Sequence, residues 1–282
     1  MSQPVRSVCG LVAYDGTEFH GFQVQKRVAT IQGELETALS RVVGQPVRIS
    51  GAGRTDSGVH ASGQVIATEV SWRHPLEDLQ RAWNAYLPSA ITVRKLQGAP
   101  VRFHPRFSAL DRTYRYTVVL ATDSQPWAPR RSPLTDRYAL YVTDPLDLVA
   151  MNKAAQLLLG EHDFATFGQA PTGDSTVRVV YEAKWGLAQL DPGPLHDPCG
   201  QQCVFLIRAN AFLYQMVRNL VGALLQVGQG RWSLTDFAEA LHARDRARCA
   251  PPAPPQGLVL KRIGYPVELG LQFDDEIGGN ES

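Results

Sequence analysis

The segment from Gly51 to His60, Gly-Ala-Gly-Arg-Thr-Asp-Ser-Gly-Val-His, concentrates the residues most able to do chemistry. It holds three glycines, one arginine, one histidine and a single carboxylate, Asp56. Glycines let a backbone turn tightly and approach a ligand closely. The segment is not a dinucleotide-binding fingerprint, because Asp56 replaces the third glycine, and no Gly-Lys-Ser/Thr follows to make a P-loop. Two interpretations remain, a tight turn in which Asp56 caps local amides and a loop that presents a catalytic carboxylate.

A second unusual residue is Arg218, in the segment FLYQMVRNLVGALLQVG. Apolar residues cover this predicted helix nearly all round, which is typical of a buried helix. A buried arginine keeps its proton and therefore needs an anionic partner, either a structural carboxylate or a group in a site.

The third candidate is the alternating strand around Tyr114, Arg115 and Tyr116, with Arg112 two residues before Tyr114. Alternation places Tyr114 and Tyr116 on one face. The pattern fits an ordinary strand with aromatic core residues. It also fits a ring that stacks on a nucleobase beside phosphate-binding arginines.

The elements that must position these residues follow from apolar periodicity. In the first half the pattern predicts strand, helix, strand, strand, helix, strand, which is the split βαβ order of an α+β fold. The strands are expected at 5–14, 47–50, 63–70 and 91–96, and the helices at 31–43, ended by Gly44, and from Pro75 to just before Pro88.

The second half repeats this theme less regularly. A helix is expected from Asp144-Pro145 to Gly160, because Asp suits the cap and Pro the first helical position. The Arg218 helix, a short helix at 234–242 and a last strand, LVLKRIGY, follow. We place the boundary near Pro100–Pro105, which gives an N-terminal half, 1–103, and a C-terminal half, 104–282.

Composition narrows the functional class. The net charge is +1, but residues 102–137 contain seven Arg and three Asp, a local excess of +4 that could meet phosphates. No apolar run approaches the ~18 residues of a membrane span, and no signal peptide is recognised, so we expect a cytoplasmic protein without a membrane partner. The pattern His196-x-x-Cys199-x-x-x-Cys203 lacks a fourth ligand, so we expect no metal.

Read together, these segments resemble one family. GAGRTDSGVHASGQV is similar to the active-site motif of the bacterial tRNA pseudouridine synthase A family. Further blocks are similar in the same order along nearly the whole chain: YDGTEFHGFQVQ, ATIQGELETAL, NAYLP, FHPRFSALDRTYRY, GEHDFATF, FLYQMVRNLVGALLQVG and APPQGLVL.

The resemblance implies the pseudouridine synthase fold, two α/β halves that share a central antiparallel or mixed sheet flanked by helices, with the active-site cleft between them. It implies that Asp56 is the catalytic carboxylate and nucleophile. Tyr114 would pack on the uracil, Arg54 would help to extrude and replace the target base, and Arg218 would be the basic partner of Asp56. The family acts on uridines 38, 39 and 40 of the tRNA anticodon stem-loop, as a homodimer without cofactor or metal.

Two other functions stay open on the residues alone. A non-catalytic RNA-binding module would bind by stacking, but it gives no reason for a lone Asp56 in a glycine loop opposite a buried Arg218. A hydrolase using Asp56 would need a second carboxylate or histidine at motif spacing, and His60 alone is weak support for it.

Overall fold

A computed structural model describes residues 4–121, 133, 135–170, 175–188 and 200–273. The strands are β1 (Val5–Tyr14), β2 (Ser50–Gly51), β3 (His60–Ser71), β4 (Ile91–Gly98), β5 (Asp111–Ala121), β6 (Leu140–Val142), β7 (Gly160–Asp163), β8 (Val177–Leu187), β9 (Gly200–Ala209) and β10 (Leu258–Gly264). The helices are α1 (Ile31–Val43), α2 (Leu76–Tyr86), α3 (Leu148–Gln156), α4 (Met216–Gly228) and α5 (Leu234–Ala243), with short 3-10 turns at Arg246–Arg248, Pro255–Gly257 and Val267–Leu269. None of the helices in these ranges is long and apolar enough to cross a membrane.

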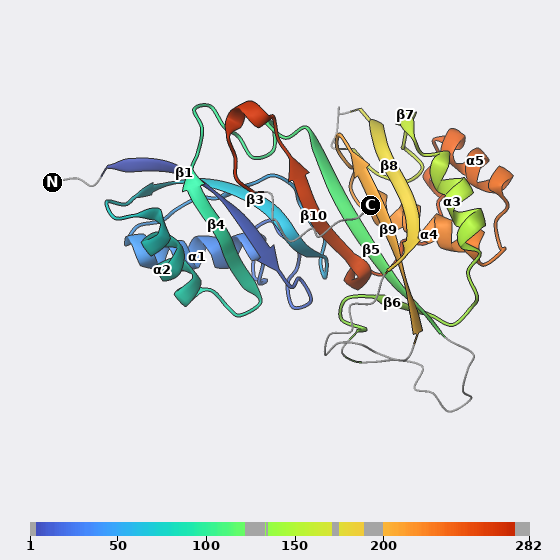
Figure 1. The fold of residues 1–282 in the computed structure, drawn as a ribbon, viewed down its shortest axis with the longest axis horizontal. Helices are drawn as coiled ribbons and strands as arrows, with labels where there is room; N and C mark the ends of the chain where they lie inside the picture. Colours follow the sequence, from blue (N-terminus) through green and yellow to red (C-terminus); the bar gives the residue numbers. More distant parts are fainter. Residues whose placement is uncertain (1–3, 122–132, 134, 171–174, 189–199, 274–282) are drawn as a thin grey trace.

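One sheet runs through the described molecule in the order β4-β1-β3-β10-β5-β9-β8-β7, with β2 paired to β3 and β6 to β5. The pairs β3–β10 and β5–β6 are parallel, and the other pairs are antiparallel. Helices α1 and α2 lie at the β4 end and α3, α4 and α5 at the β7 end (Figure 1). The predicted α+β fold, with a mixed central sheet flanked by helices, is therefore confirmed.

The last strand of the chain completes the middle of this sheet. Strand β10, red in Figure 1, lies between β3 and β5. It pairs through Val259 with His60, the first residue of β3, and through Leu260 with Tyr114 of β5. The loop that ends at His60 and the strand that carries Tyr114 are thus brought together by β10.

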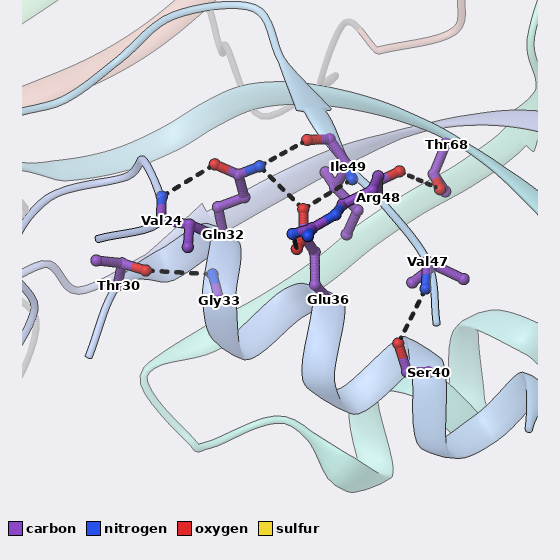
Figure 2. Close-up of polar contacts among 10 residues, drawn as sticks. All are labelled: Val24, Thr30, Gln32, Gly33, Glu36, Ser40, Val47, Arg48, Ile49 and Thr68. Carbon is purple, nitrogen blue, oxygen red and sulfur yellow. Dashed lines mark hydrogen bonds and ion pairs between the residues drawn. The ribbon is translucent and has the colours of Figure 1, made fainter. Parts of the chain in front are cut away.

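Helix α1 was predicted correctly and also fixes the segment that leads to the glycine loop. Thr30 caps it, and Gly44 ends it in the left-handed conformation with φ 72°. Glu36 is buried, and its carboxylate accepts from Ile49 N at 3.0 Å and from Gln32 Nε2 at 2.9 Å, and pairs with Arg48 at 3.0 Å (Figure 2).

These contacts explain an error in the expected strand at 47–50, since only Ser50 and Gly51 form a strand. Main-chain groups of the preceding residues bond to side chains instead of to a neighbouring strand. Val47 N donates to Ser40 Oγ at 3.1 Å, and Arg48 O accepts from Thr68 Oγ1 at 2.7 Å (Figure 2). Side chains here take the main-chain hydrogen bonds that a neighbouring strand would otherwise make. The β-branched residues Val47 and Ile49 therefore do not extend the sheet.

The helix expected from Asp144 also begins later. Asp147 is the N-cap of α3, and its side chain accepts from Ala150 N at 2.9 Å. Asp144 instead pairs with Arg231 at 2.9 Å. Either aspartate could cap a helix, but Asp144 pairs with Arg231, which is distant in sequence, and Asp147 is therefore the cap.

Candidate active site

The glycine loop, residues 52–59 between β2 and β3, is tied down by groups on both sides. Gln64, fully buried in β3, donates from Nε2 to Gly53 O at 2.8 Å and accepts from Gly53 N at 3.3 Å. The Tyr14 hydroxyl lies 2.8 Å from Thr55 Oγ1. Thr55 O also accepts from Phe22 N at 3.0 Å. The main chain on either side of Arg54 is therefore fixed before any ligand binds.

Two glycines allow this loop to pack so closely. Gly21 has φ 87°, and a Cβ there would lie 2.7 Å from Thr55 O. Gly58 has φ 76°, and a Cβ there would lie 3.0 Å from the Pro255 ring. A side chain at either position would be strained, and it would push against the glycine loop from Gly21 and against Pro255 from Gly58. The sequence YDGTEFHGF and the glycine loop thus form one packed unit.

Asp56 and Arg218 are brought together as predicted. Arg218 Nη1 lies 3.5 Å from Asp56 Oδ2, and the two side chains keep 13% and 20% of their exposure. Every residue of α4 is buried except Arg218 and Gln226, and most of the buried ones are apolar, so Arg218 lies in a largely apolar helix. The geometry gives Arg218 the anion that its burial requires.

A proline-rich main-chain segment before β10 holds Arg218 in place. Arg218 Nε donates to Ala253 O at 2.7 Å, and Ala253 N donates to Arg218 O at 2.9 Å. This segment, 250–257, also approaches α4 so closely that Gly222 has no room for a Cβ beside Pro251 O. The run APPAPPQG therefore forms one wall of the site, which its proline-rich composition did not indicate.

The surroundings of Asp56 act on its ionisation in opposite directions. Burial raises the pKa of Asp56 above its ordinary value, and the charge and hydrogen bond of Arg218 lower it. Burial is the larger effect, so the net pKa is raised. Arg218 thus keeps a desolvated carboxylate closer to its ionised form than burial alone would allow.

Tyr114 lies beside this pair and is 8% exposed. Burial, Tyr14 and the Asp56 carboxylate all raise the pKa of its hydroxyl, so the phenol stays protonated at neutral pH. Phe212 packs edge-on against its ring, with the centroids 5.1 Å apart. Phe212 is a neighbour that the sequence analysis did not single out, because it stands just outside α4 and was read as part of that helix.

Arg112, considered above as a phosphate ligand, binds main-chain carbonyls instead. Its Nη1 donates to Asn210 O at 2.8 Å and Ala109 O at 3.4 Å, and its Nη2 to Arg106 O at 2.7 Å and Ala52 O at 3.4 Å. All four of these bonds go to main-chain carbonyls. Arg112 therefore joins three loops around the site, and the phosphate interpretation is wrong for it.

Arg54 and His60, the other charged or titratable residues of the motif, point to different surroundings. Arg54 is exposed, and no hydrogen bond or ion pair joins it to Asp56 or Arg218.

His60 Nδ1 lies 3.1 Å from both Asp15 Oδ1 and Gly16 N. Burial lowers the pKa of His60 and Asp15 opposes that shift, so a neutral ring accepts from Gly16 N. His60 lines a cavity of about 470 Å³ with Asp15, and Asp56 does not line it. His60 is therefore not placed to act with Asp56 in a hydrolase.

No group of three metal-ligating side chains converges within the described residues. His196 and Cys199 of the sequence pattern lie outside the described residues. Cys203 is buried in β9 as a free thiol.

Comparison with known proteins places this geometry in a family. The family model described as tRNA pseudouridine synthase matches residues 11–108 and 154–266. The chain is 40% identical over 256 residues to tRNA pseudouridine synthase A of Brevibacillus brevis, which covers 90% of this chain and 98% of that protein. It is 41% identical over 266 residues to tRNA pseudouridine synthase A of Chloroflexus aurantiacus, which covers 94% and 91%. Among solved structures, the archaeal box H/ACA sRNP Nop10-Cbf5 complex overlaps 87% of this chain and 60% of that chain at 12% identity with a TM-score of 0.35, which is too loose to carry an argument.

Proposed function

The chain belongs to the tRNA pseudouridine synthase family, and from that premise we propose that it isomerises uridine to pseudouridine in tRNA with Asp56 as its catalytic carboxylate. The target uridines are those of the anticodon stem-loop at positions 38, 39 and 40. The protein acts in the cytoplasm as a homodimer and uses no cofactor or metal.

The reaction needs few groups because the substrate keeps all of its heavy atoms. The N1–C1′ glycosidic bond breaks, the uracil turns in place, and a C5–C1′ bond forms. The C5 proton leaves to solvent, and N1 gains a proton. A base stacked in an RNA stem must first be flipped out, so the site must replace its stacking partners.

The observation that carries the proposal is the Asp56–Arg218 pair at 3.5 Å. A carboxylate that attacks the sugar must be ionised. Burial raises the pKa of Asp56, and Arg218 opposes that rise and favours the ionised form. A module that binds RNA by stacking alone has no use for a desolvated carboxylate whose charge an arginine maintains.

The remaining motif residues have complementary roles. Tyr114, next to Asp56 and packed by Phe212, offers the apolar ring on which the detached uracil turns. Arg54 is exposed on the loop that carries Asp56, so its long side chain is free to enter the place that the flipped base leaves. We assign both residues to substrate binding.

Release of tritium from [5-³H]uridine in bulk tRNA tests the proposal and separates it from its alternatives. An isomerase releases tritium and leaves the base attached to the tRNA. An RNA-binding module retains tRNA on a filter without release, and a hydrolase liberates free uracil. Mapping of the product pseudouridines to positions other than 38–40 would contradict the assigned substrate region while leaving the reaction intact.

A further inference from the structure

A rigid turn between β4 and β5, residues 104–108, lies on the surface and has no part in the chemistry described above. His104 organises it, because His104 Nδ1 accepts from Arg106 N at 3.1 Å and from Phe107 N at 3.3 Å. Ser108 closes it, donating from N to His104 O at 2.9 Å and accepting from His104 N at 3.1 Å through Oγ. A loop with this many internal bonds holds one conformation.

Two side chains from outside the turn hold it as well. Arg112 of β5 donates to Arg106 O at 2.7 Å. Tyr265, just after β10, donates from its hydroxyl to Pro105 O at 2.7 Å. The turn is thus attached to the centre of the sheet, so a ligand that touches it is positioned relative to β5.

What this turn presents to solvent is an aromatic ring. Phe107 is 77% exposed, although burying a Phe side chain would contribute about 2 kcal/mol. The His104 ring packs on one side of it at a centroid distance of 4.4 Å. The Arg106 guanidinium carbon lies 5.6 Å from the ring centroid. Arg102 is exposed nearby in sequence. The surface combines a fixed aromatic ring with positive charge.

The turn is connected to the glycine loop that carries Asp56. The same Nη2 of Arg112 that bonds Arg106 O also bonds Ala52 O, at the start of the glycine loop. Arg112 and Tyr114 are two residues apart on β5, so they share a face about 7 Å apart along the strand. Arg112 therefore ties the main chain of the Phe107 turn to the loop that carries Asp56.

We propose that Phe107 is a stacking platform for an unpaired base of the tRNA that lies beside the target uridine, with Arg102 and Arg106 at the adjoining phosphates. The inference rests on the proposed function. Base–aromatic stacking beside arginine is the common means of holding unpaired RNA. The acid nearest to this turn in sequence, Asp111, pairs with Arg208 at 3.4 Å and not with Arg102 or Arg106. The surface therefore keeps its positive charge, which favours a polyanion over a second copy of the chain.

The test compares Phe107→Ala and Phe107→Trp with wild type and with Val149→Ala, a control at another exposed apolar position, 66% exposed on α3. The readouts are the dissociation constant for tRNA and kcat/KM for tritium release. Stacking predicts that Phe107→Ala weakens tRNA binding and lowers kcat/KM by about tenfold, that Phe107→Trp restores both, and that Val149→Ala changes neither. An unchanged melting temperature for Phe107→Ala is expected, since the ring is exposed.

Other outcomes separate the two proposals. Phe107→Ala with wild-type tRNA binding and kcat/KM overturns the stacking platform while leaving the proposed function in place. A loss that appears together with a change of oligomeric state in light scattering assigns Phe107 to a protein contact and also overturns it. If wild-type protein binds tRNA but releases no tritium, the proposed function fails, and a weaker tRNA affinity of Phe107→Ala still supports the platform.

Discussion

Arg218 of α4 and Asp56 of the loop before β3 meet with Nη1 3.5 Å from Oδ2, although they lie in opposite halves of the chain. Strand β10 makes this meeting possible, because it pairs with β3 on one side and with β5 on the other. The segment that precedes β10 carries Ala253, which fixes the Arg218 guanidinium from behind. The electrostatic balance at Asp56 therefore depends on three segments that are far apart in sequence.

This relationship predicts how activity depends on pH. Arg218 lowers the pKa of Asp56 against the larger effect of burial, so Arg218→Ala raises that pKa. Activity requires the ionised carboxylate, which is lost as pH falls through its pKa. The acidic limb of the kcat profile in the tritium-release assay should therefore move to higher pH in Arg218→Ala, and kcat should fall at neutral pH.

Arg218→Lys is the matched control, because it keeps a positive charge but loses the guanidinium fork. We expect it to shift the acidic limb less than Arg218→Ala does. An Arg218→Ala profile that is reduced in height but not displaced in pH would show that the pair is not electrostatically coupled as described.

The polar contacts in Figure 2 predict an effect on protein stability that does not involve the catalytic residues. Glu36→Ala leaves the buried Ile49 N–H without its acceptor and removes the partner of Gln32. An unsatisfied buried donor costs about 1–3 kcal/mol, so chemical denaturation should show a loss of that size in the free energy of unfolding.

Arg48→Ala is the control for Glu36→Ala, since it breaks the ion pair from a side chain that is 87% exposed. Exposed pairs contribute roughly 0–1 kcal/mol, so this loss should be the smaller one. Equal losses in the two variants would mean that the ion pair, and not the bond to Ile49, stabilises the segment.

Binding of tRNA should weaken steeply with salt despite the net charge of +1. Seven arginines and three aspartates lie between residues 102 and 137, and Arg102 and Arg106 among them are exposed. Each neutralised phosphate releases counterions, so the logarithm of the affinity should fall linearly with the logarithm of salt concentration. A dissociation constant that hardly changes across the titration would place the RNA on another surface.

The order of elements could be predicted from strong local patterns, and the Asp56–Arg218 pair from the resemblance to the family. The apolar stripe of α1, its left-handed Gly44 and the nearly uniform apolar surface of α4 are short-range signals. Arg218 in such a helix needs an anion, and the resemblance identified Asp56 as that anion.

The errors arise where distant residues compete for the same groups. Val47 to Ile49 favour a strand by composition, but side chains of α1 and β3 take their main-chain bonds. Asp144 has the residue type of a cap, but Arg231 binds it. Arg112 has the residue type of a phosphate ligand, but four carbonyls surround it. An exposed Phe107 cannot be distinguished from a core aromatic by sequence, since exposure depends on the finished turn.

Tritium release by Asp56→Asn tests the central claim most directly. Asn keeps the size of the side chain but cannot act as an ionised carboxylate, so turnover of [5-³H]uridine tRNA should be abolished. Phosphate contacts carry the binding, so the dissociation constant for tRNA should stay within about tenfold of wild type, roughly 1.4 kcal/mol. Turnover near the wild-type rate in Asp56→Asn would contradict the account and remove Asp56 from the chemistry.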